Sequence, residues 1–207
     1  MNPILEQIQN IGIVPVIAIE DAANAPALAR ALLAGGLPVA EVTFRTEAGE
    51  EAIRRIAAEV PEMLVGAGTV LNVKQAEQAL VAGAKFIVSP GLDAETVQFC
   101  RQGGVPVFPG CATPTEMQAA INLGLTHLKF FPAEQAGGLA YLKAVSAAYP
   151  ALRFMPTGGI GPNNLRAYLA FEKIFACGGS WMCPRSQINA GKWEEITQLC
   201  MEAREAK

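Results

Sequence analysis

Lys129 stands inside an apolar run, residues 127–132, that has the composition of a buried β-strand. A lysine in such a run either extends to water or is buried, and burial disfavours its charged ammonium form. A lysine that is partly neutral near pH 7 is a nucleophile, and its characteristic reaction is imine formation with a carbonyl compound. The ordinary alternative is a lysine at a strand end with its amine in solvent. The residues elsewhere in the chain decide between the two.

Two further charged residues, Glu41 and Arg45, end another apolar run. Because side chains alternate along a strand, Glu41, Thr43 and Arg45 share one face, and Val42 and Phe44 point to the other. Charges on the inner face of a closed sheet are unfavourable unless they are paired or used. Two interpretations stay open, an internal salt bridge between Glu41 and Arg45 or a catalytic role.

Eight short apolar runs, about 20–26 residues apart and separated by helical patterns, are typical of repeated βα units. The runs cover residues 13–19, 38–43, 63–68, 85–89, 106–109, 126–130, 152–156 and 173–177. Eight strands predict an α/β protein with the (β/α)8 TIM-barrel fold, formed as a single domain over residues 1–207. A flavodoxin-like open sheet has the same order of elements but normally fewer strands. Helices over residues 3–10 and 192–206 are expected to flank the barrel.

Capping signals place the helices between these runs. Thr113 and Glu116 form a capping box, and Gly124 is expected to end the helix that they begin. Asn72 and Asp93 are good N-caps for the segments that they open. The loops that precede these caps therefore connect strand ends to helix starts, which is where barrel enzymes carry their chemistry.

Glycine pairs follow the seventh and eighth runs, at Gly158-Gly159 and at Gly178-Gly179, the latter followed by Ser180. The corresponding loops of TIM barrels commonly bind a phosphate through backbone N–H groups and a helix N-terminus. Either pair alone is explained by a turn or a helix C-cap. Both pairs together, at these two strands, favour a phosphate site.

Three other strand ends carry candidate site residues or turns. Thr69 offers a hydroxyl after Gly66-Ala67-Gly68, whose small residues let another group approach the backbone, although a tight turn is the simpler explanation. Pro90, within Ser89-Pro90-Gly91, indicates a shaped turn after the fourth run. Cys111 follows the fifth run and is interpreted as a packing residue, as is Cys177 after the eighth.

The overall composition excludes several classes of protein. A net charge of −3 without a basic run argues against binding of nucleic acid or anionic membranes. The first residues lack the features of a signal peptide, and no apolar run approaches the ~20 residues of a membrane span. The five cysteines are odd in number and lack a C-x-x-C pair, so we expect reduced thiols in a cytoplasmic protein.

Metal chemistry is disfavoured because no cluster of His, Asp or Glu has the spacing of metal ligands. His127 is the only histidine. It precedes Lys129 by two residues, so we expect it on the same inner face, deeper in the barrel. A structural role is favoured for His127 over a catalytic one.

Together these motifs strongly resemble those of bacterial 2-keto-3-deoxy-6-phosphogluconate (KDPG) aldolases, nearly end to end, in order and at consistent spacing. The motifs are Glu41-Val-Thr-Phe-Arg45-Thr-Glu, Val65-Gly-Ala-Gly-Thr69, Ser89-Pro90-Gly91, Lys129-Phe-Phe-Pro132-Ala-Glu, Pro156-Thr157-Gly158-Gly159-Ile160 and Gly178-Gly179-Ser180-Trp181. The resemblance implies a class I aldolase, free of metal and cofactor, that splits KDPG into pyruvate and glyceraldehyde 3-phosphate. It also implies activity on 4-hydroxy-2-oxoglutarate and assembly into a homotrimer of barrels.

The resemblance also implies a role for each matching residue. Lys129 forms the Schiff base and Glu41 is the acid/base. The other roles are carboxylate binding by Arg45 and Thr69, phosphate binding by Gly158, Gly159, Gly179 and Ser180, stereochemical choice by Thr157, and walls of the pyruvyl pocket by Pro90 and Phe131.

Two other functions remain open from the residues. A phosphosugar epimerase or synthase on the same barrel would use Lys129 only as an electrostatic group. A catalytically silent barrel would act as a scaffold, but it need not keep inward charges such as Lys129, Glu41 and Arg45. The sequence does not decide among KDPG, its galactose-derived epimer and 4-hydroxy-2-oxoglutarate as the preferred substrate.

Overall fold

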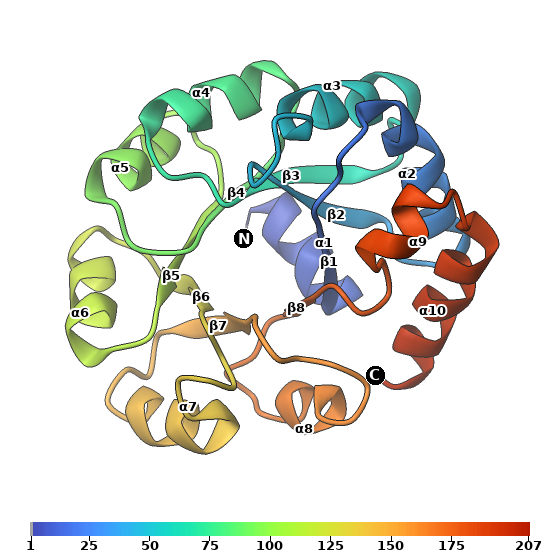
Figure 1. Cartoon of the computed structure of the whole chain (residues 1–207). Helices are drawn as coiled ribbons and strands as arrows, with labels where there is room; N and C mark the ends of the chain where they lie inside the picture. Colours follow the sequence, from blue (N-terminus) through green and yellow to red (C-terminus); the bar gives the residue numbers. More distant parts are fainter. Residues whose placement is uncertain (1) are drawn as a thin grey trace.

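The structure, a computed structural model, describes residues 2–207 and shows eight parallel strands surrounded by helices (Figure 1). Neighbouring strands follow the order β7-β6-β5-β4-β3-β2-β1-β8. The strands are β1 (Ile13–Ile17), β2 (Val39–Thr43), β3 (Leu64–Gly68), β4 (Ile87–Ser89), β5 (Val107–Cys111), β6 (His127–Phe130), β7 (Arg153–Pro156) and β8 (Cys177–Gly179). Single bridges, Phe154 to Ile174 and Thr157 to Gly178, connect β7 to the β8 segment and nearly close the sheet. The predicted TIM barrel is confirmed.

The first seven strands lie within the predicted runs or overlap them closely, but the prediction for the eighth strand was wrong. The apolar run at residues 173–177 was expected to form it, whereas β8 begins only at Cys177. Residues 173–176 contact β7 through a bridge and two backbone hydrogen bonds. The ladder with β1 starts where Ile13 pairs with Cys177. Gly178 and Gly179 are therefore part of the strand instead of following it.

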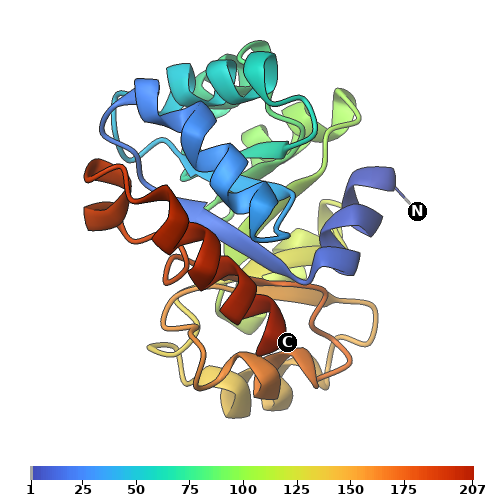
Figure 2. The same cartoon turned by 90° about the vertical axis from the view of Figure 1, so that its right-hand side faces the viewer.

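The helices are α1 (Pro3–Ile11), α2 (Ala25–Ala34), α3 (Gly49–Glu59), α4 (Val73–Val81), α5 (Ala94–Gln102), α6 (Pro114–Asn122), α7 (Gly138–Ser146), α8 (Leu165–Leu169), α9 (Arg185–Asn189) and α10 (Trp193–Glu205), with a short 3-10 turn η1 (Ala22–Asn24). The predicted capping box of Thr113 and Glu116 is present, and the side chains of Asn72 and Asp93 cap α4 and α5. The expected flanking helices correspond to α1 and α10, and Figure 2 shows α1 at one end of the barrel, away from the ring of helices.

The apolar core has two layers. The larger layer lies between the strands and the outer helices. The smaller layer fills the barrel interior beneath the carboxyl ends of the strands and consists mainly of Val14, Val39, Leu64, Phe86, Val88, Phe108, Met155 and Phe175, covered by Ile8 of α1. Phe108 lies 6.1 Å from Phe86 and 5.4 Å from Phe175, measured between ring centroids. Aromatic rings thus close the amino end of the barrel, and the opposite end is left for polar groups.

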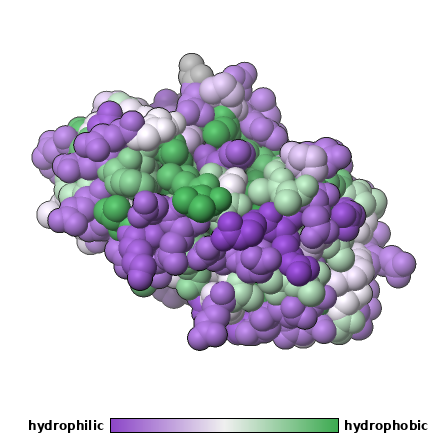
Figure 3. All heavy atoms as spheres, turned by 90° about the horizontal axis from the view of Figure 1, so that it is seen from above, coloured by the Kyte–Doolittle hydropathy of each residue, from purple (hydrophilic) through white to green (hydrophobic). Residues whose placement is uncertain are grey.

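The outer surface is mostly hydrophilic on the side that carries α3 and α4 in Figure 1, with an apolar patch set into it (Figure 3). The most exposed large apolar side chains of the described residues are Val81, in α4, at 73% and Leu71, just before it, at 56%. No helix within residues 2–207 is long and apolar enough to cross a membrane.

Candidate active site

A cavity of about 260 Å³ opens at the carboxyl ends of the strands. Its walls are Val16, Glu41, Arg45, Thr69, Pro90, Lys129, Phe131, Thr157, Gly158, Gly159, Ile160, Gly179 and Ser180. The structure brings together every residue for which the sequence predicted a site role. Val16 and Ile160 were not predicted, because an apolar residue on a strand or after a glycine pair looks like any other core residue.

Lys129 and Glu41 meet across the barrel, although they are far apart in the chain. The Nζ atom of Lys129 lies 3.4 Å from Oε1 of Glu41. The side chains are 6% and 0% exposed, so each charge is removed from water and depends on the other. Within residues 2–207, Glu41 pairs with Lys129 and forms no salt bridge with Arg45. The interpretation of Glu41 and Arg45 as an internal salt bridge was therefore wrong. The second carboxylate oxygen of Glu41 is buried without a hydrogen-bond partner, which leaves it available to exchange a proton with a bound molecule.

The small residues of β3 make room for this carboxylate. A Cβ atom added to Gly68 would collide with the carboxylate of Glu41, so a larger residue there would displace it. Thr69 follows at once with a φ of +56°, the one positive φ at a non-glycine residue in the described chain. A β-branched residue is strained in this region, and such strain is found mostly where function needs it. The backbone therefore holds the Thr69 side chain against the cavity at an energetic cost.

Arg45 lines the cavity on the same side as Thr69 and makes no ion pair with a carboxylate of the described residues. A guanidinium without an acidic partner suits a bound carboxylate, because its fork donates two parallel hydrogen bonds. Arg45 and Thr69 thus form an end of the cavity that can bind an anion.

The glycine-rich loop after β7 forms the other end. Its carbonyls at Thr157 and Gly158 accept hydrogen bonds from the N–H groups of Ala133 and Glu134, at 2.8 and 3.0 Å. The N–H groups of Gly159 and Ser180 donate no hydrogen bond within the described part of the chain. Unpaired N–H groups around a concave loop can bind a phosphate.

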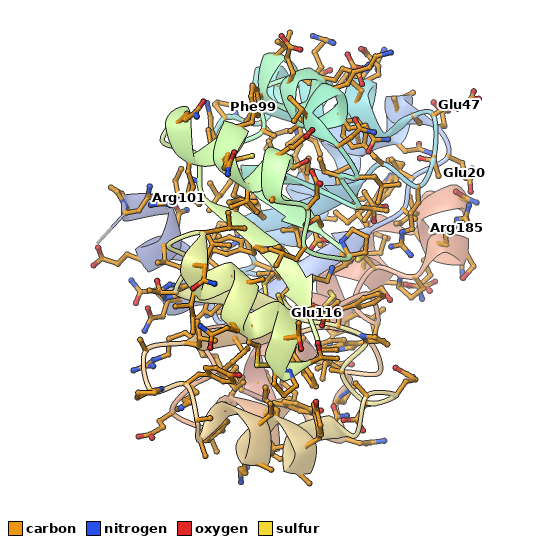
Figure 4. All side chains as sticks on the ribbon, turned by 90° about the vertical axis from the view of Figure 1, so that its left-hand side faces the viewer. Glu20, Glu47, Phe99, Arg101, Glu116 and Arg185 are labelled. Carbon is orange, nitrogen blue, oxygen red and sulfur yellow. The ribbon has the colours of Figure 1, made fainter. Side chains whose placement is uncertain are left out.

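An exposed ion pair lies outside the lining of the cavity. Arg185, the first residue of α9, contacts Glu20 in the loop after β1. Figure 4 shows these two residues together at one edge of the molecule, with Glu47 on the same side and Arg101 at the opposite edge.

Comparison with known proteins agrees with this geometry. A family model described as KDPG and KHG aldolase matches residues 4–199. The chain belongs to this family. A relative from Treponema pallidum (strain Nichols), named 2-dehydro-3-deoxy-phosphogluconate aldolase, is 46% identical over 202 residues, which are 98% of this chain and 96% of the relative.

Two solved structures of KDPG aldolases are similar along nearly their whole length. The enzyme from Legionella pneumophila, with pyruvate captured at low pH as a covalent carbinolamine intermediate, has a TM-score of 0.89 at 40% identity, and the match covers 92% of both chains. The enzyme from Zymomonas mobilis ZM4 with 3-phosphoglycerate has a TM-score of 0.90 at 43% identity, covering 98% of this chain and 96% of that one.

Thr157 lines the same cavity in this member of the aldolase family. It follows β7, on the inner face two residues beyond Met155, and is almost completely buried. A Cβ atom on Gly178 would collide with the Thr157 hydroxyl, so the eighth strand must carry glycine there. The second glycine pair therefore has a packing function that the sequence did not indicate.

Other titratable groups near the aldolase cavity do not line it. His127 lies one inward position below Lys129, and its ring packs edge-on against Phe175, 5.1 Å away. Burial, together with the positive charge of Arg153, lowers the pKa of His127. Cys111 and Cys177 lie in the layer between strands and helices, where burial raises the pKa of each thiol to about 12. Within residues 2–207, no three His, Cys, Asp or Glu side chains cluster as a metal site.

Proposed function

We propose that this chain, acting as a single domain, is a class I aldolase that cleaves KDPG into pyruvate and D-glyceraldehyde 3-phosphate through an imine on Lys129. The observation that supports this best is the buried Lys129–Glu41 pair between an anion-binding end and a glycine-rich end of one cavity. Family membership adds support, as does the covalent pyruvate intermediate in the Legionella relative. The same chemistry would cleave 4-hydroxy-2-oxoglutarate into pyruvate and glyoxylate.

In this mechanism the amine of Lys129 attacks the keto carbon of the substrate and forms a carbinolamine. Glu41 moves the proton that lets water leave, which gives the imine. Glu41 then takes the proton of the substrate's C4 hydroxyl as the C3–C4 bond breaks. The bond electrons pass to the imine nitrogen and form an enamine, and the aldehyde leaves. Protonation at C3 and hydrolysis release pyruvate and restore the lysine.

The remaining cavity residues would hold the substrate in line for this step. Arg45 and Thr69 would bind the carboxylate next to the keto carbon. Pro90 and Phe131 would form the walls of the pyruvyl pocket, and the Phe131 ring centre lies 5.2 Å from Nζ of Lys129. At the far end, the backbone of Gly158, Gly159 and Gly179 and the side chain of Ser180 would bind the phosphate, with Thr157 at the C4 hydroxyl.

A retro-aldol assay tests this function. Purified protein mixed with KDPG should release pyruvate and glyceraldehyde 3-phosphate in equal amounts, and a chelator should leave the rate unchanged. A phosphosugar epimerase would convert its substrate without releasing pyruvate, and a scaffold barrel would do nothing. Loss of the rate with chelator and its return with a divalent metal would contradict the imine mechanism.

The same assay with three substrates would establish preference. KDPG is proposed as the preferred substrate over its galactose-derived epimer because the Thr157 hydroxyl, in the cavity wall, would meet the C4 hydroxyl. Equal kcat/KM values for both epimers would show that Thr157 does not discriminate between them.

We also propose that the chain assembles as a homotrimer. The apolar patch in Figure 3 and the exposure of Val81 and Leu71 support an assembled form, because large apolar side chains in water favour contact with another surface. Light scattering should give three times the chain mass, and Val81→Glu should shift the equilibrium toward monomer if α4 lies in the interface. A monomeric parent would contradict the trimer.

A further inference from the structure

Thr43 is the last residue of β2 and lies between Glu41 and Arg45, fully buried and outside the cavity lining. Its hydroxyl donates to the carbonyl of Ile17 in β1 at 2.7 Å. The Nε atom of Arg45 donates to the same hydroxyl oxygen at 3.2 Å. A threonine hydroxyl has one proton and two acceptor positions. Since Ile17 takes the proton, the oxygen can only accept a hydrogen bond from Arg45.

This hydrogen bond restrains the orientation of the guanidinium. With Nε held by Thr43, the N–H groups that remain are on the two Nη atoms, which can donate to the two oxygens of a carboxylate. A long arginine side chain loses much rotamer freedom when it binds a ligand, and prior restraint at Nε removes part of that loss. Thr43 therefore prepares Arg45 before any substrate arrives.

A neighbouring threonine provides a matched comparison. Thr46 follows Arg45, and its hydroxyl donates to the carbonyl of Ile19 at 2.6 Å. Thr43 and Thr46 thus tie the same segment to the β1 side of the barrel, one on each side of Arg45. Only Thr43 also accepts a hydrogen bond from Arg45.

We propose that Thr43 is a positioning residue that orients Arg45 toward the carboxylate of the keto-acid substrate and so sets affinity at the pyruvyl end. This inference rests on the proposed aldolase function and adds a determinant of carboxylate affinity to it. It predicts a defect that is confined to the carboxylate end and leaves the phosphate end intact.

The test compares four variants by borohydride trapping at increasing pyruvate concentration. Thr43→Val keeps the shape and removes the acceptor, Thr43→Ser keeps the hydroxyl, and Thr46→Val removes the neighbouring tie only. Thr43→Cys keeps a weak donor for Ile17 but is a poor acceptor, so it replaces Thr43→Val if that variant does not fold. Inhibition of KDPG cleavage by inorganic phosphate is measured in parallel as the readout of the phosphate end.

Thr43→Val should raise the half-saturating pyruvate concentration about tenfold, the scale of one hydrogen bond to a charged group. Its saturated rate of trapping and its phosphate inhibition should stay within about twofold of the parent, which a general loss of stability would not reproduce. Thr43→Ser should restore pyruvate affinity and Thr46→Val should retain it.

Two results would overturn the proposal in different ways. If the parent is trapped by pyruvate and Thr43→Val or Thr43→Cys saturates at the parent's concentration, the positioning role is wrong and the aldolase function stands. An equal loss in Thr46→Val would assign the effect to the loop and also reject the role of Thr43. If the parent is not trapped at all, both proposals fail together.

Discussion

The two halves of the barrel interior, the apolar amino half and the polar carboxyl half, are built on the same strands. One inward-facing position along a strand separates them. On β2, Val39 belongs to the aromatic and aliphatic cluster at the amino end, and Glu41, two residues on, lies in the cavity. The same step leads from Met155 to Thr157 along β7. A rise of about 6.6 Å for two strand residues separates the closed apolar half from the polar half.

This difference assigns stability and chemistry to different layers. The amino half buries apolar side chains that contact one another, which stabilises the fold. The carboxyl half buries a lysine and a glutamate, an arrangement that is often no more stable than an apolar pair of the same volume. Changes in the amino half, here called the lower layer, should therefore destabilise the fold. Changes in the carboxyl half, here called the upper layer, should impair the reaction and substrate recognition.

The largest effect is expected in the upper layer at Glu41. Glu41→Gln keeps the shape of the side chain and removes the proton acceptor, so kcat for KDPG cleavage should fall by about 10²–10⁴. Thermal unfolding of the variant should show an intact fold. Activity within a few-fold of the parent would reduce Glu41 to a structural partner of Lys129.

The opposite result is expected in the lower layer at Phe108. Phe108→Ala removes a ring that contacts Phe86 and Phe175, so the free energy of unfolding should fall by about 3–5 kcal/mol. Below the unfolding transition, kcat/KM per folded molecule should stay within a few-fold of the parent. Denaturant titration with activity at each point measures both quantities, and a large loss of kcat in the folded state would remove the separation between the layers.

A smaller effect concerns discrimination within the upper layer. Thr157→Val is nearly isosteric and removes a hydroxyl that would bind the C4 hydroxyl of KDPG, so the preference for KDPG over its galactose-derived epimer should fall about tenfold. Ser180→Ala is the matched control at the phosphate end. It should raise KM for KDPG and leave 4-hydroxy-2-oxoglutarate, which has no phosphate, almost unaffected.

The outcome of this comparison tests the placement of both residues. An unchanged epimer ratio in Thr157→Val would show that the hydroxyl is elsewhere. If Ser180→Ala raises KM equally for KDPG and for 4-hydroxy-2-oxoglutarate, the phosphate of KDPG does not bind at Ser180.

The smallest effect is the pH dependence of the stability that His127 contributes in the lower layer. Burial lowers the pKa of His127 in the folded state, so the unfolded state binds more protons between that pKa and the ordinary value. Stability due to neutral His127 is therefore present above about pH 6.5 and is lost as the pH falls below it. Replacement in His127→Leu should flatten the change in urea midpoint between pH 8 and pH 5. An equally steep change in the variant would assign the acid sensitivity to other groups.

The sequence predicted most of the fold because strand and helix signals are local. Seven strands follow from apolar runs, and the caps follow from side chains within three residues of the helix starts. The eighth strand was misplaced because its pairing residues are Cys177, Gly178 and Gly179, and glycine carries no strand signal. The apolar residues before it pack beside β7 and do not form the ladder with β1.

The cavity lining was predicted from motifs, but its internal contacts were not. The partner of Glu41 is Lys129, on a strand across the barrel, and no local pattern indicates such a pair. The link from Thr43 to Arg45 depends on a carbonyl of β1 that fixes the hydroxyl proton. Contacts of this kind are set by strand register and barrel closure, which the order of residues alone does not determine.

The central claim is that Lys129 forms an imine with the keto acid, and peptide mass analysis after pyruvate and borohydride treatment tests it most directly. The account predicts loss of activity and one pyruvate-derived adduct on the peptide that carries Lys129. Lys129→Ala should take up no adduct, and Lys143→Ala, which changes an exposed lysine of α7, should behave like the parent. An adduct on Lys143, or on no lysine, would contradict the account.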